Sequence, residues 1–140
     1  MRIKLFVLAM VVLTLLPALA AAGDVVVIVN PSVAASSLSK QDVSNIYQGK
    51  KSTWDDGSKI VFVVLKGSAA HEQFLTAYVG KTDTQFDTFW KKQVFTGQGS
   101  PPQAFDSDQA MIDFVAKTSG AIGYVSAGAK VANVKTITVQ

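Results

Sequence analysis

Apolar residues along the chain fall into two patterns, continuous β-branched runs and stretches with the spacing of a helix. The continuous runs, which are typical of buried strands, occupy residues 24–30 and 60–65, and two shorter strands are expected at 121–125 and 135–139. The helical stretches follow residues suited to cap a helix, which are Ser39, Ser68, Thr82, and Asp106 or Ser107. This order of strands and helices predicts an α/β domain with a mixed sheet of about five strands flanked by helices.

The second apolar run leads directly through a turn into a helix. Gly67 allows the tight turn, and the hydroxyl of Ser68 stands where it can accept a hydrogen bond from the first helical turn. A helix N-terminus has unpaired N–H groups and a partial positive charge, so it attracts anions. The residues that would form a small-oxyanion site here are Ser68, Ala69, Ala70 and Lys66. The alternative is a capped helix without a ligand, with Lys66 in solvent.

Two further polar residues, Asn30 and Ser32, follow the first apolar run. In an open α/β sheet, ligands bind beyond the carboxyl ends of the strands. We therefore expect Asn30 and Ser32 to share one edge of the sheet with Ser68 and to belong to the same anion site.

The sequence gives little support for a metal site or for a catalytic site. The chain has one histidine and no cysteine, and no pair of carboxylates stands at ligand spacing beside His71. Ser68 and His71 lie one helical turn apart, but the sequence has no G-x-S-x-G elbow and no residue placed to orient the base. We interpret His71 and Glu72 as exposed residues of the first helical turn, and we expect no catalytic residue, metal or cofactor.

The N-terminus has the features of a secretory signal peptide. A basic start, Arg2 and Lys4, precedes a long apolar stretch and then a run of small residues. We place the signal peptide at residues 1–22, with cleavage between about Ala20 and Gly23, and an uncleaved anchor is the alternative. The mature protein is then expected in the periplasm, with no membrane span after the signal is removed.

Residues 23–140 are long enough for one domain with its own core and too short for two. Without Arg2 and Lys4, eleven basic residues stand against ten acidic ones. The basic residues are scattered rather than clustered, which argues against nucleic-acid binding. All of them are lysines, so the mature chain lacks the planar guanidinium group that holds phosphate with two parallel hydrogen bonds.

Two stretches of the chain have a recognisable pattern: residues 45–60 read NIYQGKKSTWDDGSKI and residues 116–128 read AKTSGAIGYVSAG. They resemble a Gly-x-x-x-x-Trp stretch and a Gly-Ala-Ile-Gly-Tyr-Val stretch of phosphate-binding proteins from ABC-type phosphate-uptake systems. The early VVVIVNPS and the central FWKKQVFTGQGSPP resemble short single-domain members, called phosphate-transporter substrate-binding-like proteins.

The resemblance implies one lobe of a type II periplasmic-binding-protein fold. Full-length members hold phosphate between two lobes, so we expect closure over a ligand to require another chain. Their phosphate loop reads roughly R-x-D-x-S-G-T, and only its serine is retained here, as Ser68. Val64 and Lys66 stand in place of the arginine and aspartate, and Ala69 and Ala70 in place of the glycine and threonine.

Two functions stay open at this point. The first is an exported, non-enzymatic protein that binds phosphate or another small oxyanion weakly, in connection with an ABC permease. The second is an accessory or sensory module that keeps the fold without a ligand. Such a module would dock onto another envelope protein or onto itself, through the irregular loop at residues 97–102.

Overall fold

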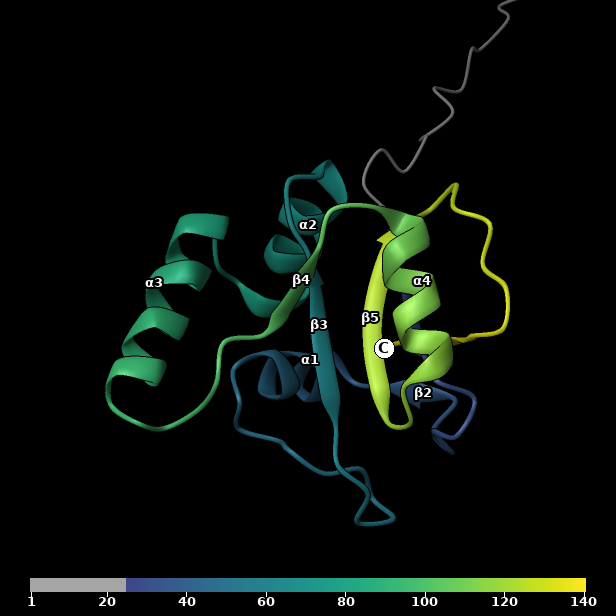
Figure 1. The fold of residues 1–140 in the computed structure, drawn as a ribbon, viewed down its shortest axis with the longest axis horizontal. Coiled ribbons are helices and arrows are strands. Elements are labelled where there is room, and N and C mark those ends of the chain that lie inside the picture. Colours follow the sequence, from purple (N-terminus) through teal and green to yellow (C-terminus); the bar gives the residue numbers. More distant parts are fainter. Residues whose placement is uncertain (1–24) are drawn as a thin grey trace, which may run out of the picture.

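A mixed sheet of six strands forms the centre of the structure, a computed structural model that describes residues 25–140 (Figure 1). The strands are β1 (Val25–Val29), β2 (Ser37–Leu38), β3 (Val61–Leu65), β4 (Gln103–Phe105), β5 (Ala121–Ser126) and β6 (Lys135–Val139). Their order across the sheet is β2-β6-β1-β5-β3-β4. The expected signal peptide at 1–22 and its cleavage site lie outside the described residues.

The directions of the strands decide which loops share an edge. β1 is antiparallel to both of its neighbours, β5 and β6. β3 is parallel to its neighbours β5 and β4. β1 and β3 therefore run in opposite directions, and the segments that follow them lie at opposite edges of the sheet.

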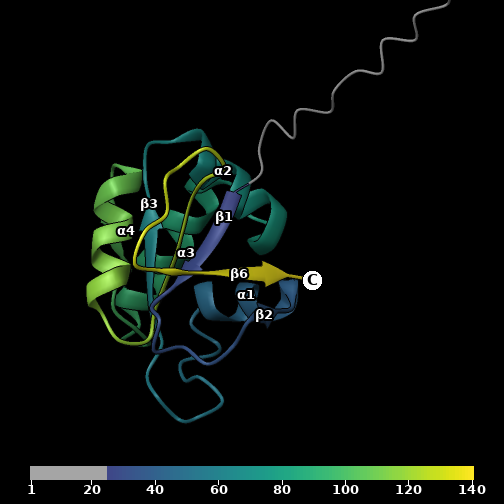
Figure 2. The same ribbon diagram turned by 90° about the vertical axis from the view of Figure 1, so that its right-hand side faces the viewer.

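Four α-helices and one π-helical segment accompany the sheet in the described part of the chain. They are α1 (Lys40–Tyr47), α2 (Ala69–Phe74), η1 (Leu75–Val79), α3 (Asp83–Phe95) and α4 (Asp108–Lys117). Each α-helix begins after a side chain that accepts a hydrogen bond from the first turn, as the sequence predicts: Ser39, Ser68, Thr82 and Ser107. Figure 2 shows α4 on one side of the sheet, with α1 and α2 on the other.

Two consecutive residues of β5 show how the sheet packs on both faces. A methyl group at Gly123 would overlap the sulfur atom of Met111 in α4, so this position has room only for hydrogen. The next side chain, Tyr124, points the other way, and its ring stacks on Phe74 of α2 with centroids 3.8 Å apart. Because successive side chains of a strand point to opposite faces of the sheet, β5 contacts a helix on each side.

Both tryptophans are core residues, as their size and apolar character predict. Trp54 and Trp90 are each 6% exposed. The indole N–H of Trp54 donates to Gly120 O, and that of Trp90 donates to Tyr47 O, each at 3.0 Å. Their polar atoms are therefore satisfied within the core.

The two shortest strands, β2 and β4, are not predicted by the sequence pattern. They have two and three residues, and they form only by pairing with β6 and β3, respectively. The helix that follows Ser68 changes from α to π geometry at Leu75. Gly80 ends it with a left-handed backbone conformation.

Candidate functional site

The turn from β3 into α2 has the geometry that the sequence predicts. Gly67 has φ +75°, a value that favours glycine. The Ser68 hydroxyl accepts from the N–H of His71 at 3.3 Å and donates to Leu65 O at 3.4 Å. Ala69 is exposed, whereas Ala70 is only 4% exposed. Of the two amides expected to meet an anion, that of Ala69 belongs to the more accessible residue.

Lys66 is not a free cation beside this turn. Its ammonium nitrogen lies 2.9 Å from Asp87 Oδ1 of α3, and both side chains are more than one third exposed. An exposed pair of this kind contributes about 0.2–1 kcal/mol, so a competing anion can displace it. The pair ties the end of β3 to α3.

Asn30 and Ser32 do not lie near Ser68, and the expectation of a shared edge was wrong. Because β1 runs opposite to β3, Asn30 lies beside the start of β5, where its N–H donates to Ala121 O at 2.9 Å. The Asn30 amide group donates to Val115 O at 2.8 Å. The Ser32 hydroxyl accepts from the N–H of Gly120 at 3.2 Å. Both side chains join α4 and the start of β5 to the loop after β1.

The expectation that His71 is exposed was also wrong, although Glu72 is exposed as expected. His71 is 1% exposed and lies between two polar partners. Its Nδ1 lies 2.5 Å from the hydroxyl of Tyr124, and its Nε2 lies 3.0 Å from Asp83 Oδ1. The signal in the sequence was the spacing: His71 falls on the same helical stripe as the buried Phe74.

A family described as a PBP superfamily domain matches residues 13–139. The chain belongs to the PBP superfamily. The matched segment starts inside the expected signal peptide and covers all of the described residues except Gln140. No curated protein matches the chain.

The chain is similar to solved structures that include phosphate-binding proteins. An ABC-type phosphate transport receptor from Vibrio cholerae is 21% identical with a TM-score of 0.66, over 82% of this chain and 45% of that one. A phosphate ABC transporter substrate-binding protein with bound phosphate from Clostridium perfringens is 21% identical, with a TM-score of 0.65 over 82% and 44%. PstS from Borrelia burgdorferi is 16% identical, with a TM-score of 0.62 over 83% and 47%.

These likenesses confirm the predicted fold class, an α/β lobe of the PBP type. At such identities they show the fold alone. The PBP domain described here spans less than half the length of each of these three proteins.

Hydrogen-bond directions in the PBP domain assign the protons around His71. The Asp83 carboxylate can only accept, so Nε2 of His71 carries a hydrogen and donates to it at 3.0 Å. In the neutral ring Nδ1 then accepts from the Tyr124 hydroxyl, whose oxygen also accepts from the N–H of Leu65 at 3.1 Å. Burial raises the pKa of the Tyr124 hydroxyl and the charge of Asp83 adds to this, against the opposing effect of the bond from Leu65. The hydroxyl therefore stays protonated at neutral pH.

This chain of bonds leaves no base for Ser68. Both ring nitrogens of His71 are engaged by Tyr124 and Asp83, and the contact of Ser68 is with the backbone N–H of His71. The arrangement joins the end of β3, the start of α2 and the start of α3 instead. Its effect is to hold the Ser68 turn in place.

In residues 25–140, no group of three or more histidine, aspartate or glutamate side chains lies close enough to hold a metal ion. Among the same residues, no helix has the length and apolarity needed to cross a membrane.

Proposed function

We propose that this PBP domain is an exported binding protein, not an enzyme, that takes up phosphate or a similar small oxyanion weakly and works with an ABC-type phosphate permease. The observation that carries the proposal is the Ser68 turn, a capped helix start with the exposed Ala69 beside it. The names of proteins with the same fold support the ligand, because they are phosphate receptors and one contains bound phosphate.

The ligand would be held by three groups at the end of β3. The Ser68 hydroxyl makes only a long bond to Leu65 O, so it can turn to donate to an anion. The N–H of Ala69 has no helical partner because it lies in the first turn. The ammonium group of Lys66 can exchange Asp87 for the ligand. The amide of the buried Ala70 would take a smaller part.

Asn30 and Ser32 take no part in this proposal, because they lie at the opposite edge of the sheet. The missing arginine and the single lobe are the reasons to expect weak binding. A second copy or another chain would have to close over the ligand.

Titration calorimetry of the mature domain with phosphate tests the proposal. We expect saturable heat that Ser68→Ala abolishes. Asp87→Asn should tighten binding by up to about fivefold, because it releases Lys66 from an exposed ion pair. Asp113→Asn removes the same charge from α4 and should leave binding unchanged. Absence of heat at millimolar phosphate, together with no shift in the melting temperature, would refute phosphate binding.

A second candidate function is an interaction module that retains the fold without a ligand. It is favoured by the engagement of Lys66 with Asp87 and by the loss of the family's arginine. Such a module would bind another envelope protein. Phosphate binding by a monomer that retains no protein from envelope extracts would exclude it. Recovery of the processed chain in a periplasmic fraction tests the predicted export.

A further inference from the structure

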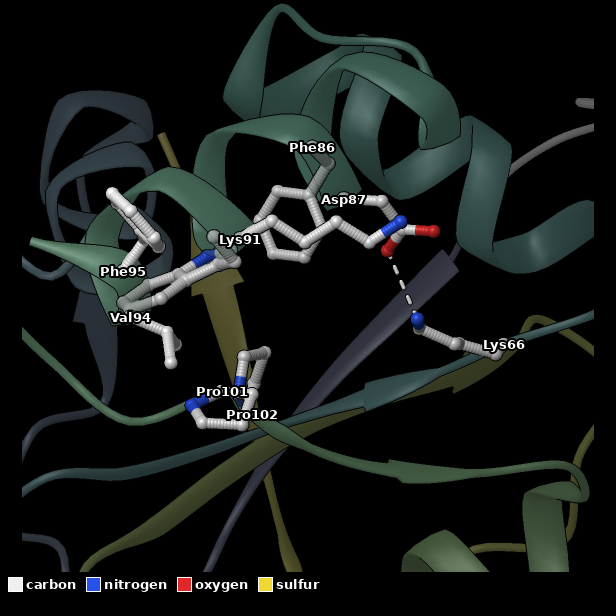
Figure 3. Close-up of a pocket in the computed structure, with 9 residues that line it drawn as sticks. Lys66, Phe86, Asp87, Lys91, Val94, Phe95, Pro101 and Pro102 are labelled. Atoms are coloured by element: carbon white, nitrogen blue, oxygen red, sulfur yellow. Dashed lines mark hydrogen bonds and ion pairs between the residues drawn. The ribbon is translucent and has the colours of Figure 1, made fainter.

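A groove of about 570 Å³ lies between α3 and the segment that leads into β4 (Figure 3). Its walls are mainly apolar and are formed by Phe86, Trp90, Val94, Phe95, Pro101 and Pro102. Figure 3 shows the two prolines facing α3 across the hollow, with Lys66 and Asp87 joined at one end. Pockets for small organic ligands measure about 300–1,000 Å³, so this volume suits such a molecule.

The rear wall of the groove is rigid. The Trp90 indole donates to Tyr47 O, which fixes the plane of the ring. A Cβ atom at Gly49 would lie 3.0 Å from the ring, and one at Gly99 would lie 3.1 Å from it. Two glycines thus leave the space that the indole fills, and Phe86 is 1% exposed behind it. The hollow is therefore formed before any ligand arrives.

The mouth of the groove exposes apolar surface to water. Phe95 is 92% exposed and Val94 is 42% exposed. They are two of the three exposed large hydrophobic side chains in the described part of the chain, and the third is Val131. An apolar molecule seated in the groove would gain free energy by covering these two side chains.

The charge at the groove is positive. Lys66 and Asp87 balance each other at one end. Lys91 follows Asp87 by one helical turn and forms no ion pair with any residue in 25–140. One positive charge is therefore left to meet a ligand, and it favours a single negative group at the edge of an apolar body.

An added β-strand fits this surface poorly. β4 has only three residues, and its free edge follows Pro101 and Pro102, which lack N–H groups. A bound segment would find few backbone partners there, so a compact ligand is favoured over an extended peptide.

We infer that the groove binds an amphipathic organic anion, an aromatic or branched apolar body with one carboxylate or sulfonate group. The apolar body lies between Trp90 and the two prolines, beneath Phe95. The anionic group lies at Lys91. Lys66 borders both this groove and the Ser68 turn, but the apolar walls and Lys91 belong to the groove alone, so its use does not depend on phosphate binding.

Two fluorescent probes with the same ring system test the inference. Anilinonaphthalene sulfonate carries one negative charge, and N-phenylnaphthylamine carries none. We expect saturable one-to-one binding of the sulfonate to the folded domain, and weaker binding of the neutral amine. Near-ultraviolet circular dichroism at each protein concentration establishes that the folded form is the one that binds.

Three variants separate the contributions of charge and apolar surface. Lys91→Gln should weaken sulfonate binding by up to about fivefold and leave binding of the amine unchanged. Phe95→Ser should weaken both probes, and it should not impair folding because the side chain is exposed. Lys117→Gln removes an exposed charge from α4 and should change neither.

Three results would overturn the inference. Binding that never saturates, or that neither Lys91→Gln nor Phe95→Ser reduces, would show that the probes do not occupy the groove. A dimer in light scattering that Phe95→Ser converts to a monomer would show that a second copy covers the groove instead.

Discussion

Removal of the Tyr124 hydroxyl is the sharpest test of the buried hydrogen-bond chain. The Tyr124 oxygen accepts from the N–H of Leu65 and bonds to Nδ1 of His71, in a region where Tyr124 itself is fully buried. Tyr124→Phe retains the ring, which can still stack on Phe74. The substitution therefore removes two hydrogen bonds and very little packing, and it leaves two buried polar atoms without partners.

The expected loss follows from the two orphaned atoms. A buried donor or acceptor left unsatisfied costs about 1–3 kcal/mol, so the two orphaned atoms of Tyr124→Phe should lower the free energy of unfolding by about 2–6 kcal/mol. Tyr47→Phe is the matched control. The Tyr47 hydroxyl donates to Val63 O at 3.0 Å and lies 3.4 Å from Ile122 O, and each of these carbonyl oxygens has a second lone pair for another donor. Its loss should cost only about 1 kcal/mol.

Urea denaturation followed by circular dichroism measures both variants on one scale. The midpoint should fall further for Tyr124→Phe than for Tyr47→Phe, with an unchanged slope. An equal loss of unfolding free energy in the two variants would refute the reasoning. It would mean that the N–H of Leu65 and Nδ1 of His71 are satisfied by other partners when the Tyr124 hydroxyl is absent.

Three further predictions concern pH, packing and a helix cap. Burial raises the pKa values of Tyr47 and Tyr124 in the folded protein, so unfolding above about pH 10 releases protons from these hydroxyls. The free energy of unfolding should therefore fall as the pH rises beyond about 10, and it should fall less steeply in Tyr124→Phe. Gly123→Ala should cost about 1–3 kcal/mol, seen as a lower urea midpoint, because the new methyl group overlaps Met111. Ser107→Ala should cost about 1 kcal/mol in the same assay through loss of its bond from the N–H of Ala110, whereas Ser100→Ala in the exposed loop should have no effect.

Features that depend on neighbouring residues could be predicted from the sequence. The caps at Ser39, Ser68 and Thr82 are examples, because a cap is formed within one turn of its own helix. The long apolar runs were predicted as strands for the same reason. β4 was missed because its three residues carry no pattern of their own and form a strand only through pairing with β3.

Features that depend on the direction of distant strands could not be predicted. Asn30 and Ser68 each follow a buried strand, and a sheet in which β1 and β3 were parallel would have placed them together. β1 is instead antiparallel to β5, which is parallel to β3, so Asn30 lies at the other edge. The bond between His71 and Tyr124 could not be predicted either, because the two residues are 53 positions apart in the sequence.

Lys66 links the two surfaces for which we propose ligands. Alignment to the family's phosphate loop gives its position beside Ser68 but not the direction of its side chain, which depends on Asp87 in α3. That ion pair draws Lys66 toward the groove and away from the role of a free cation. Asp87 also lines the groove, so a charge change there acts on both surfaces, and on the Ser68 turn by releasing Lys66. A change at Lys91 acts on the groove alone and a change at Ser68 acts on the turn alone, so the two proposals can be refuted separately.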